Sequence, residues 1–341
     1  MMGEPLLQVR ELSKVFPLGG GLFRRPRAWV RAVEGVSFDL FHGECLGLVG
    51  ESGCGKTTVG RLVMRLLEPT SGRVFFQGKD LTRMSPSELR SMRREMQIIF
   101  QDPYSSLDPR KKVVDIVTEP LWVTGLGRSE RRREAGELLE KVGLRASDMD
   151  KYPHEFSGGQ RQRIGIARAL ATRPKMIVAD EPVSALDVSI QAQVLNLLVD
   201  LQRELGLSYI LISHDLSIVE YMCDRVAVMY LGRIVELAPV EVFQEDVRHP
   251  YTLSLKASVL PPDPTARWEP PPLEGDVPSP IEPPEGCSFH PRCPYAFEIC
   301  GKKRPELREV GDGHWVSCWL NDGVGVLGEK KEGLKMGARE R

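Results

Sequence analysis

The glycine-rich segment 50–57 constrains the fold of this chain more than any other feature. It reads Gly-Glu-Ser-Gly-Cys-Gly-Lys-Thr, which fits the pattern G-x-x-x-x-G-K-[ST]. A wholly apolar run, residues 45–49, precedes it, and the pattern of residues 57–67 predicts a helix after it. Such glycines let backbone N–H groups turn inward around phosphate oxygens, and the N-terminus of the following helix attracts the same anion. The segment therefore predicts a phosphate-binding loop between a buried strand and a helix.

The chemistry of phosphate binding assigns roles within this loop. Lys56 is expected to neutralise charge on the β- and γ-phosphates, and the hydroxyl of Thr57 to ligate Mg²⁺. The residues expected to contact the nucleotide here are Gly50, Ser52, Gly53, Cys54, Gly55, Lys56, Thr57 and Thr58.

Strand and helix patterns alternate along the first 250 residues. Residues 176–179 and 209–212 are apolar runs typical of buried strands, and a helix is expected between them around residues 190–204. Residues 6–10 and 30–40 alternate apolar and polar side chains, which indicates an antiparallel layer. The stretch 85–156 is expected to be mainly helical. The fold class is therefore α/β with a parallel sheet, an antiparallel β subdomain and a helical subdomain.

Composition argues against some classes of function. The net charge of the 341 residues is −1, so we expect no nucleic-acid partner. No apolar run approaches the ~20 residues that a membrane-spanning helix needs. The N-terminus lacks the basic and apolar regions of a signal peptide. We therefore expect a cytoplasmic chain that reaches a membrane only through partners.

Five further motifs follow the order found in one family. They are Gln101 after the apolar run 96–100, the segment Phe-Ser-Gly-Gly-Gln-Arg-Gln-Arg at 156–163, Met-Ile-Val-Ala-Asp-Glu at 176–181, Ser-Ala-Leu-Asp at 184–187 and Ile-Ser-His-Asp at 212–215. Each is weak alone. Together, residues 5–250 resemble the ATPase domain of ABC transporters, which implies ATP and Mg²⁺ as cofactors.

The resemblance implies a role for each matched residue. Asp180 would hold Mg²⁺ through water, and Glu181 would polarise the attacking water as general base. His214 would contact the γ-phosphate, and Gln101 would sense Mg²⁺ and the attacking water. Phe16 is the candidate to stack on adenine.

The resemblance also implies a dimer. In the family, the signature segment completes the nucleotide site of a second ATPase domain, so two domains meet head to tail around two ATP molecules. The matching residues here are Ser157, Gly158, Gly159 and Gln160. ATP would bind the closed arrangement more tightly and so favour it.

Three other segments resemble the dipeptide and oligopeptide importers within this family. They are residues 101–110, residues 249–252, and the run 275–280 followed by 286–294. The basic insertion before Trp29 and the Gly-Cys-Gly of the phosphate loop resemble the second ATPase subunit of such importers. The partners implied are a different ATPase subunit, two membrane permease subunits and, indirectly, an extracytoplasmic substrate-binding protein. The chain would then lie peripherally on the cytoplasmic side of the cell membrane.

Other functions remain open at this point. Relatives in this branch carry di- and oligopeptides, but some carry nickel, opines or oligosaccharides instead, and nothing in the chain can select a peptide. A non-transport ABC ATPase usually has two cassettes or a long coiled-coil insertion, and this chain has one cassette and no heptad insertion. A module that binds ATP without turnover is disfavoured by the presence of Glu181 and His214.

Four cysteines cluster near the end of the chain, at Cys287, Cys293, Cys300 and Cys318. The extension of the resembling family binds a [4Fe–4S] cluster, which four thiolates can hold. The alternatives are a Zn²⁺ site, with His290 or His314 as a substitute ligand, or four buried thiols without metal.

Composition also suggests domain boundaries. We expect an ATPase domain over residues 1–255, with its helical subdomain at about 102–160. Ten prolines fall between residues 261 and 284, which indicates an extended linker over 256–286. The four-cysteine extension would occupy 287–322, and the Gly-, Lys- and Glu-rich tail 323–341 would be disordered.

Overall fold

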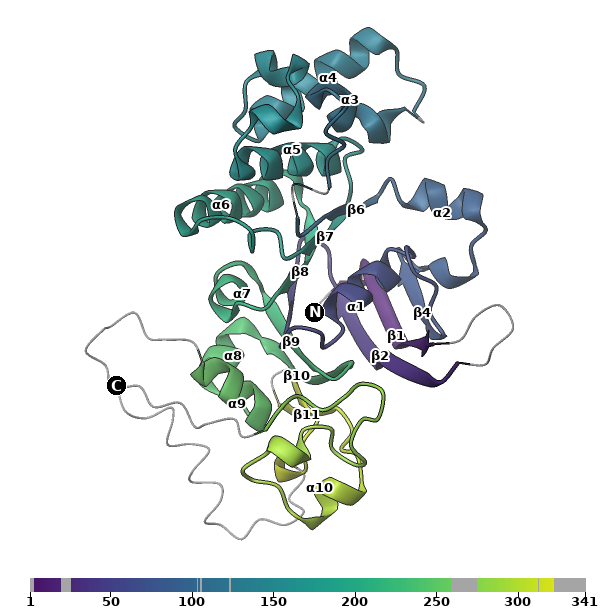
Figure 1. The fold of residues 1–341 in the computed structure, drawn as a ribbon, viewed down its shortest axis with the longest axis vertical. Helices are drawn as coiled ribbons and strands as arrows, with labels where there is room; N and C mark the ends of the chain where they lie inside the picture. The colour runs from purple at the N-terminus through teal and green to yellow at the C-terminus, as the bar shows by residue number, and fades with distance from the viewer. Residues whose placement is uncertain are drawn as a thin grey trace, which may run out of the picture.

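The computed structural model describes residues 3–19, 26–102, 104, 106–122, 124–258, 275–311 and 313–321. It contains two sheets with helices around them, so the α/β prediction is confirmed (Figure 1). Most of the basic insertion, most of the proline-rich linker and the C-terminal tail lie outside the described residues.

The larger sheet has the order β11-β12-β10-β9-β3-β8-β7-β6. Neighbouring strands from β9 to β6 pair in parallel, and the remaining pairs are antiparallel. The strands are β3 (Cys45–Val49), β6 (Met96–Ile99), β7 (Met176–Asp180), β8 (Ser208–Ser213), β9 (Arg225–Tyr230), β10 (Arg233–Pro239), β11 (Arg308–Gly311) and β12 (His314–Val316).

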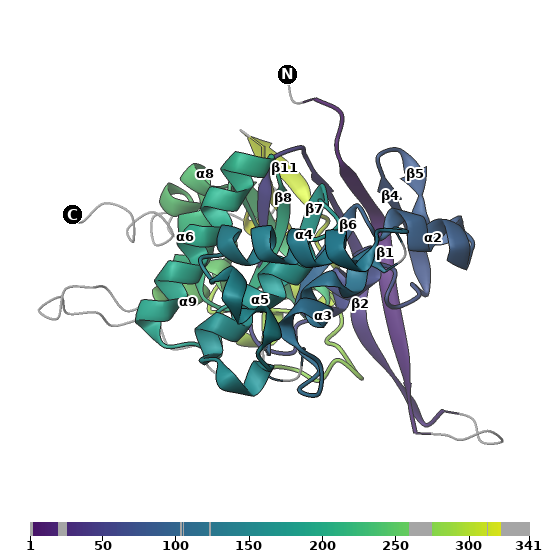
Figure 2. The same ribbon diagram turned by 90° about the horizontal axis from the view of Figure 1, so that it is seen from above.

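The central strands are covered on both faces, which explains their apolar sequences. Every residue of β3, β7 and β8 is buried. Helices α6, α8 and α9 lie on one side of this sheet, and the smaller sheet with α1 and α2 lies on the other (Figures 1 and 2). These helices, together with α5 and α7, have the bounds α1 (Lys56–Val63), α2 (Pro86–Met92), α5 (Gly158–Leu170), α6 (Val188–Leu205), α7 (Leu216–Met222), α8 (Val240–Glu245) and α9 (Pro250–Ala257).

One glycine lets α7 lie directly against the sheet. A Cβ atom on Gly47 of β3 would be 2.4 Å from Val219 Cγ1 and 3.0 Å from Cys223 Sγ. No real side chain tolerates the shorter of these distances, so the close approach of α7 depends on glycine at this position.

The smaller sheet is antiparallel and has the order β2-β1-β4-β5. Its strands are β1 (Leu7–Leu18), β2 (Ala28–Leu40), β4 (Ser71–Phe76) and β5 (Lys79–Asp80). Its buried side chains share one hydrophobic cluster with those of α1, including Val59 and Leu62. The helix after the phosphate loop is thus packed between the two sheets.

The helices of residues 113–170 form the upper part of Figure 1. They are α3 (Val113–Thr118), α4 (Arg128–Lys141) and α5, with short 3₁₀ turns at η2 (Glu119–Leu121), η3 (Ala146–Asp150) and η4 (Pro153–Glu155). The expectation that residues 85–156 are mainly helical was wrong for residues 96–99, which form β6. This strand pairs in parallel with β7, so its conformation depends on a neighbour 80 positions away in the sequence.

The C-terminal extension continues the larger sheet. Its strand β12 pairs with β10, with Val316 opposite Glu236, and β11 then pairs with β12. The extension also contains a 3₁₀ turn η5 (His290–Arg292), helix α10 (Glu298–Lys302) and a 3₁₀ turn η6 (Trp319–Asn321). Segments far apart in the sequence therefore share one sheet.

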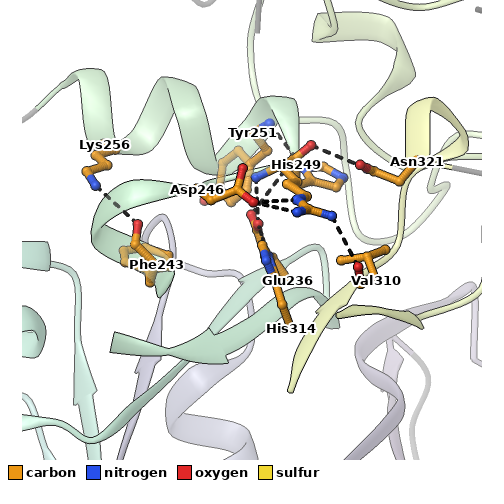
Figure 3. Close-up of polar contacts among 10 residues, drawn as sticks. Glu236, Phe243, Asp246, His249, Tyr251, Lys256, Val310, His314 and Asn321 are labelled. Atoms are coloured by element: carbon orange, nitrogen blue, oxygen red, sulfur yellow. Dashed lines mark hydrogen bonds and ion pairs between the residues drawn. The ribbon is translucent and has the colours of Figure 1, made fainter. Parts of the chain in front are cut away.

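A buried contact between two side chains, Glu236 and His314, fastens this extension to the ATPase domain (Figure 3). Glu236 of β10 and His314 of β12 are 0% and 1% exposed, and His314 Nε2 lies 2.7 Å from Glu236 Oε1. Glu236 also accepts hydrogen bonds from the backbone N–H groups of Arg248 and His249, at 2.7 and 3.1 Å. Burial lowers the pKa of His249 to about 4, so its neutral ring accepts the backbone N–H of Tyr251. The buried carboxylate thus joins three segments of the chain.

We predict that His314→Leu lowers the free energy of unfolding by about 2 kcal/mol, because it leaves the buried Glu236 side chain without its side-chain hydrogen-bond partner. Urea unfolding of the full chain measures this change. His314→Gln keeps an N–H donor at this position and should cost about 1 kcal/mol or less. Equal losses in the two variants would contradict the assignment.

Candidate functional site

The phosphate loop adopts backbone conformations that require glycine. Gly53 and Gly55 have φ angles of 79° and 107°. A Cβ atom on Gly55 would lie 2.2 Å from the carbonyl oxygen of Ala32, so a side chain is excluded there by strain and by space. Gly50 is equally confined, because its Cβ would lie 2.2 Å from the carbonyl oxygen of Met229. The turn between β3 and α1 is therefore fixed by its surroundings.

Lys56 points back into this loop. Its side chain is buried, and Nζ donates to the carbonyl oxygens of Gly50 and Glu51 at 2.6 and 2.9 Å. The ammonium group is thus held within the turn, where the sequence predicts that it meets phosphate.

Thr57, in the first turn of α1, lies beside Asp180, the last residue of β7. Thr57 Oγ1 donates to Asp180 Oδ1 at 2.9 Å. Burial raises the pKa of Asp180, and the hydrogen bond from Thr57 opposes that shift. A hydroxyl and a carboxylate oxygen are the ligands that Mg²⁺ prefers, so the donor set fits this ion.

Glu181 is contacted by Gln101 and His214, which the sequence also assigns to the nucleotide site. Gln101 Nε2 donates to Glu181 Oε2 at 2.8 Å, and His214 Nδ1 lies 3.3 Å from the same oxygen. These residues follow β6, β7 and β8, which are neighbours in the sheet. The structure therefore brings together the three residues that the sequence assigns to catalysis.

The backbone at Glu181 is strained. Its φ angle is 46°, in the left-handed region that residues with a Cβ rarely adopt, and its N–H donates to the carbonyl oxygen of Ile212 at 2.9 Å. Such conformations cost roughly 1–3 kcal/mol and cluster at functional sites. This bend directs the carboxylate toward Gln101 and His214.

The signature segment begins helix α5. Ser157 Oγ accepts the backbone N–H of Gln160 at 3.4 Å, and Gln160 Oε1 accepts that of Ser157 at 3.0 Å, which is a capping box. A Cβ atom on Gly159 would lie 2.4 Å from Ile190 Cγ2, so glycine lets α5 approach α6. In the part of the chain that the structure describes, no hydrogen bond joins this segment to residues 50–58. Its contact with nucleotide remains a prediction.

Phe16 lies on β1, opposite Val30 of β2. It is partly exposed, and Lys14 Nζ lies 5.1 Å from its ring centroid. These contacts lie within the smaller sheet and do not test whether the ring stacks on adenine. That role remains a prediction for Phe16.

The four C-terminal cysteines line one small cavity, together with His249, His290 and Trp319. Burial raises the pKa of Cys287, and raises those of Cys293 and Cys318 to about 11 and about 12, with neighbouring cysteines adding to each shift. No group of three or more His, Cys, Asp or Glu side chains among the described residues is arranged to hold a metal ion. The cysteines converge, but they are not in ligand geometry.

Sequence reasoning missed a residue that supports the phosphate loop. Tyr251 of α9 is fully buried, and its hydroxyl accepts the backbone N–H of Glu51 at 2.9 Å. The segment 249–252 stood out only for its family resemblance. A tyrosine that begins a helix gives no local indication that its hydroxyl reaches a loop 200 residues earlier.

Comparisons with known proteins agree with this geometry. Residues 33–184 match the ABC transporter family, and residues 235–300 match the C-terminal region of oligopeptide/dipeptide transporters. Two solved ATP-binding cassettes have the same fold. One is a dimer in a post-hydrolysis state bound to ADP and Pi, with TM-score 0.62 and 27% identity over 69% of this chain and 98% of that one. The other is part of the cbiONQ ABC transporter complex of Clostridium perfringens, with TM-score 0.61 and 31% identity over 71% and 92%.

Curated relatives match over nearly the whole chain. The oligopeptide transport ATP-binding protein AppF of Bacillus subtilis (strain 168) is 50% identical over 93% of this chain and 98% of that protein. The dipeptide transport ATP-binding protein DppF of Escherichia coli (strain K12) is 49% identical over 94% and 95%. The chain therefore belongs to the ATP-binding proteins of ABC transporters, in the branch that has the oligopeptide/dipeptide transporter C-terminal region.

The described residues contain no helix that is both long enough and apolar enough to span a bilayer.

We predict that Glu181→Gln retains ATP binding and lowers steady-state ATP hydrolysis by at least about 100-fold, because the amide cannot accept a proton from water. Nucleotide titration and a phosphate-release assay measure the two properties. Glu137→Gln in α4 makes the same change on an exposed helix away from the site, so this control should hydrolyse ATP normally. Unchanged turnover in Glu181→Gln would show that another group acts as base.

Proposed function

We propose that this chain is the ATP-hydrolysing subunit that drives import of di- or oligopeptides through an ABC transporter. The observation that carries the proposal is the placement of Glu181 between Gln101 and His214, beside Asp180 and the phosphate loop. The choice of peptides as cargo rests on relatives named for peptide transport that match more than nine-tenths of the chain.

The residues divide the chemistry among them. Lys56 and the backbone N–H groups of the loop bind phosphate oxygens, and Thr57 with Asp180 would hold Mg²⁺, which neutralises phosphate charge when bound. Glu181 takes a proton from the attacking water. Gln101 and His214 orient that carboxylate through the contacts described above, so the base is positioned before the substrate arrives.

The proposed partners rest on the family resemblance and on relatives named as subunits of peptide transporters. Residues 157–160 begin α5, and in the family that the sequence resembles this segment completes the site of a second ATPase domain, so we expect the same role here. That subunit would be a different chain, bound head to tail. Two permease subunits would hold the pair at the cytoplasmic side of the membrane, and an extracytoplasmic binding protein would deliver the cargo.

Uptake in the native cells tests the proposed cargo. Deletion of the gene should abolish uptake of labelled di- and oligopeptides and leave uptake of nickel and oligosaccharides unchanged. Wild-type protein should restore peptide uptake, and Glu181→Gln should not. Loss of nickel or oligosaccharide uptake instead would assign another cargo to the same ATPase.

We also propose that the four C-terminal cysteines hold a [4Fe–4S] cluster, with Zn²⁺ as the alternative. Support comes from their common cavity, because four thiols from separate turns of the chain converge on one small space. The role would be structural, since the segment is short.

Anaerobic purification followed by iron, sulfide and zinc analysis decides between these cofactors. We predict about four irons and four sulfides per chain, and loss of both in Cys293→Ser. Cys45→Ser is the control, since Cys45 is buried in β3 away from this cavity, and it should keep the metal. Stoichiometric zinc without iron would replace the cluster, and absence of both metals would reject it.

A further inference from the structure

The extension reaches the phosphate loop through one arginine. Arg292 ends the 3₁₀ turn η5, and its Nη1 and Nη2 donate to Glu51 Oε2 and Oε1 at 3.0 and 3.2 Å. The two side chains are 241 positions apart in the sequence. A guanidinium that donates to both oxygens of a carboxylate fixes its orientation as well as its charge.

Glu51 is consequently held from three directions. Its carboxylate pairs with Arg292, its N–H donates to Tyr251 Oη at 2.9 Å, and its carbonyl oxygen accepts from Lys56 Nζ at 2.9 Å. Lys56 is predicted to bind phosphate. The position of Glu51 therefore affects where the Lys56 ammonium group is held. Two of the three supports, Arg292 and Tyr251, come from the C-terminal half of the chain.

Arg292 itself is held by an aromatic cluster. Phe289 of the extension packs against Tyr230 and Tyr251, with ring centroids 5.3 and 5.5 Å apart, and the two tyrosines are 4.6 Å apart. All three rings are at most 1% exposed. The Arg292 guanidinium lies 6.0 Å from the Tyr230 ring and donates to its hydroxyl at 3.4 Å. These contacts leave the arginine little freedom to move away from the loop.

The negative charge of Glu51 makes its contact with Arg292 relevant to ATP binding. Glu51 is the second residue of a loop that receives a polyphosphate, and an unpaired carboxylate there would repel the ligand. Burial opposes the charge of Arg292, but hydrogen bonds with Glu51 and Tyr230 outweigh it and raise the pKa of the guanidinium. The arginine therefore stays cationic and cancels the charge of Glu51.

We propose that Arg292 is a positioning residue for ATP binding: the C-terminal extension uses it to neutralise and orient Glu51 of the phosphate loop. The inference rests on the proposed ATPase function and extends it, because it makes the nucleotide site depend on a segment outside the ATPase motifs. Loss of Arg292 should weaken ATP binding even when the extension stays docked.

Arg304 supplies a matched control. It is also an arginine of the extension, and its Nη1 pairs with Glu34 Oε1 of β2 at 3.0 Å. Glu34 keeps a second partner, Arg233, and lies outside the phosphate loop. Removing Arg304 therefore tests whether docking contacts of the extension in general affect ATP affinity.

Titration calorimetry of MgATP against the full chain tests the proposal, in a Glu181→Gln background that prevents turnover. We expect Arg292→Met to raise the dissociation constant by about 10-fold or more, and Arg304→Met by less than about twofold. Arg292→Lys keeps the charge but loses the paired geometry, so it should fall between the parent and Arg292→Met. Thermal unfolding checks that each variant is folded.

A second-site change separates positioning from general stability. Glu51→Gln combined with Arg292→Met leaves no unpaired charge, and it should bind ATP within about threefold of the parent. Equal affinity in Arg292→Met and the parent, equal weakening in Arg304→Met, or no recovery in the double variant would each overturn the proposal. If Arg292→Met does not fold, Arg292→Lys against Arg304→Lys decides in the same way. A parent chain that binds no MgATP would instead reject the proposed function.

Discussion

The parallel register of β3, β7 and β8 is the constraint on which the rest of the site depends. Val49 lies opposite Ser213, and Asp180 lies opposite Ile212. The three strands therefore end at one edge of the sheet. The phosphate loop, Glu181 and His214 follow the strands there, and Asp180 is the last residue of β7. Since side chains alternate between faces, a slip of one residue would turn Asp180 away from Thr57. The chemistry is thus set by backbone hydrogen bonds between strands far apart in the sequence.

Local patterns were sufficient to predict much of this arrangement. The buried strands are short apolar runs, and helix α6 covers residues 188–205 where 190–204 was expected. The glycine loop required a strand before it and a helix after it, and the structure has both. Strand β6 was missed because a run of four residues has no period of its own. Its pairing with β7 determines its conformation, and that pairing is not a property of the segment.

Contacts between distant segments could not be predicted. Glu236 interrupts the apolar residues 234–239, which indicates that it needs a buried partner, but nothing in the sequence selects His314. The same holds for Arg292 and Glu51, whose contact depends on how the extension lies over the aromatic cluster. The four C-terminal cysteines lie close together in the sequence, and they line one cavity in the structure.

The shared sheet has a consequence for how the protein is made. A ribosome synthesises β9 and β10 well before β12, so the edge of β10 lacks its neighbouring strand, and Glu236 lacks its side-chain partner, until residues 314–316 emerge. The larger sheet is therefore incomplete until the extension has been synthesised. A message cut short after the last nucleotide motif would yield a chain with an open sheet edge, which is prone to aggregation. Only chains translated through β12 can therefore form the complete eight-stranded sheet.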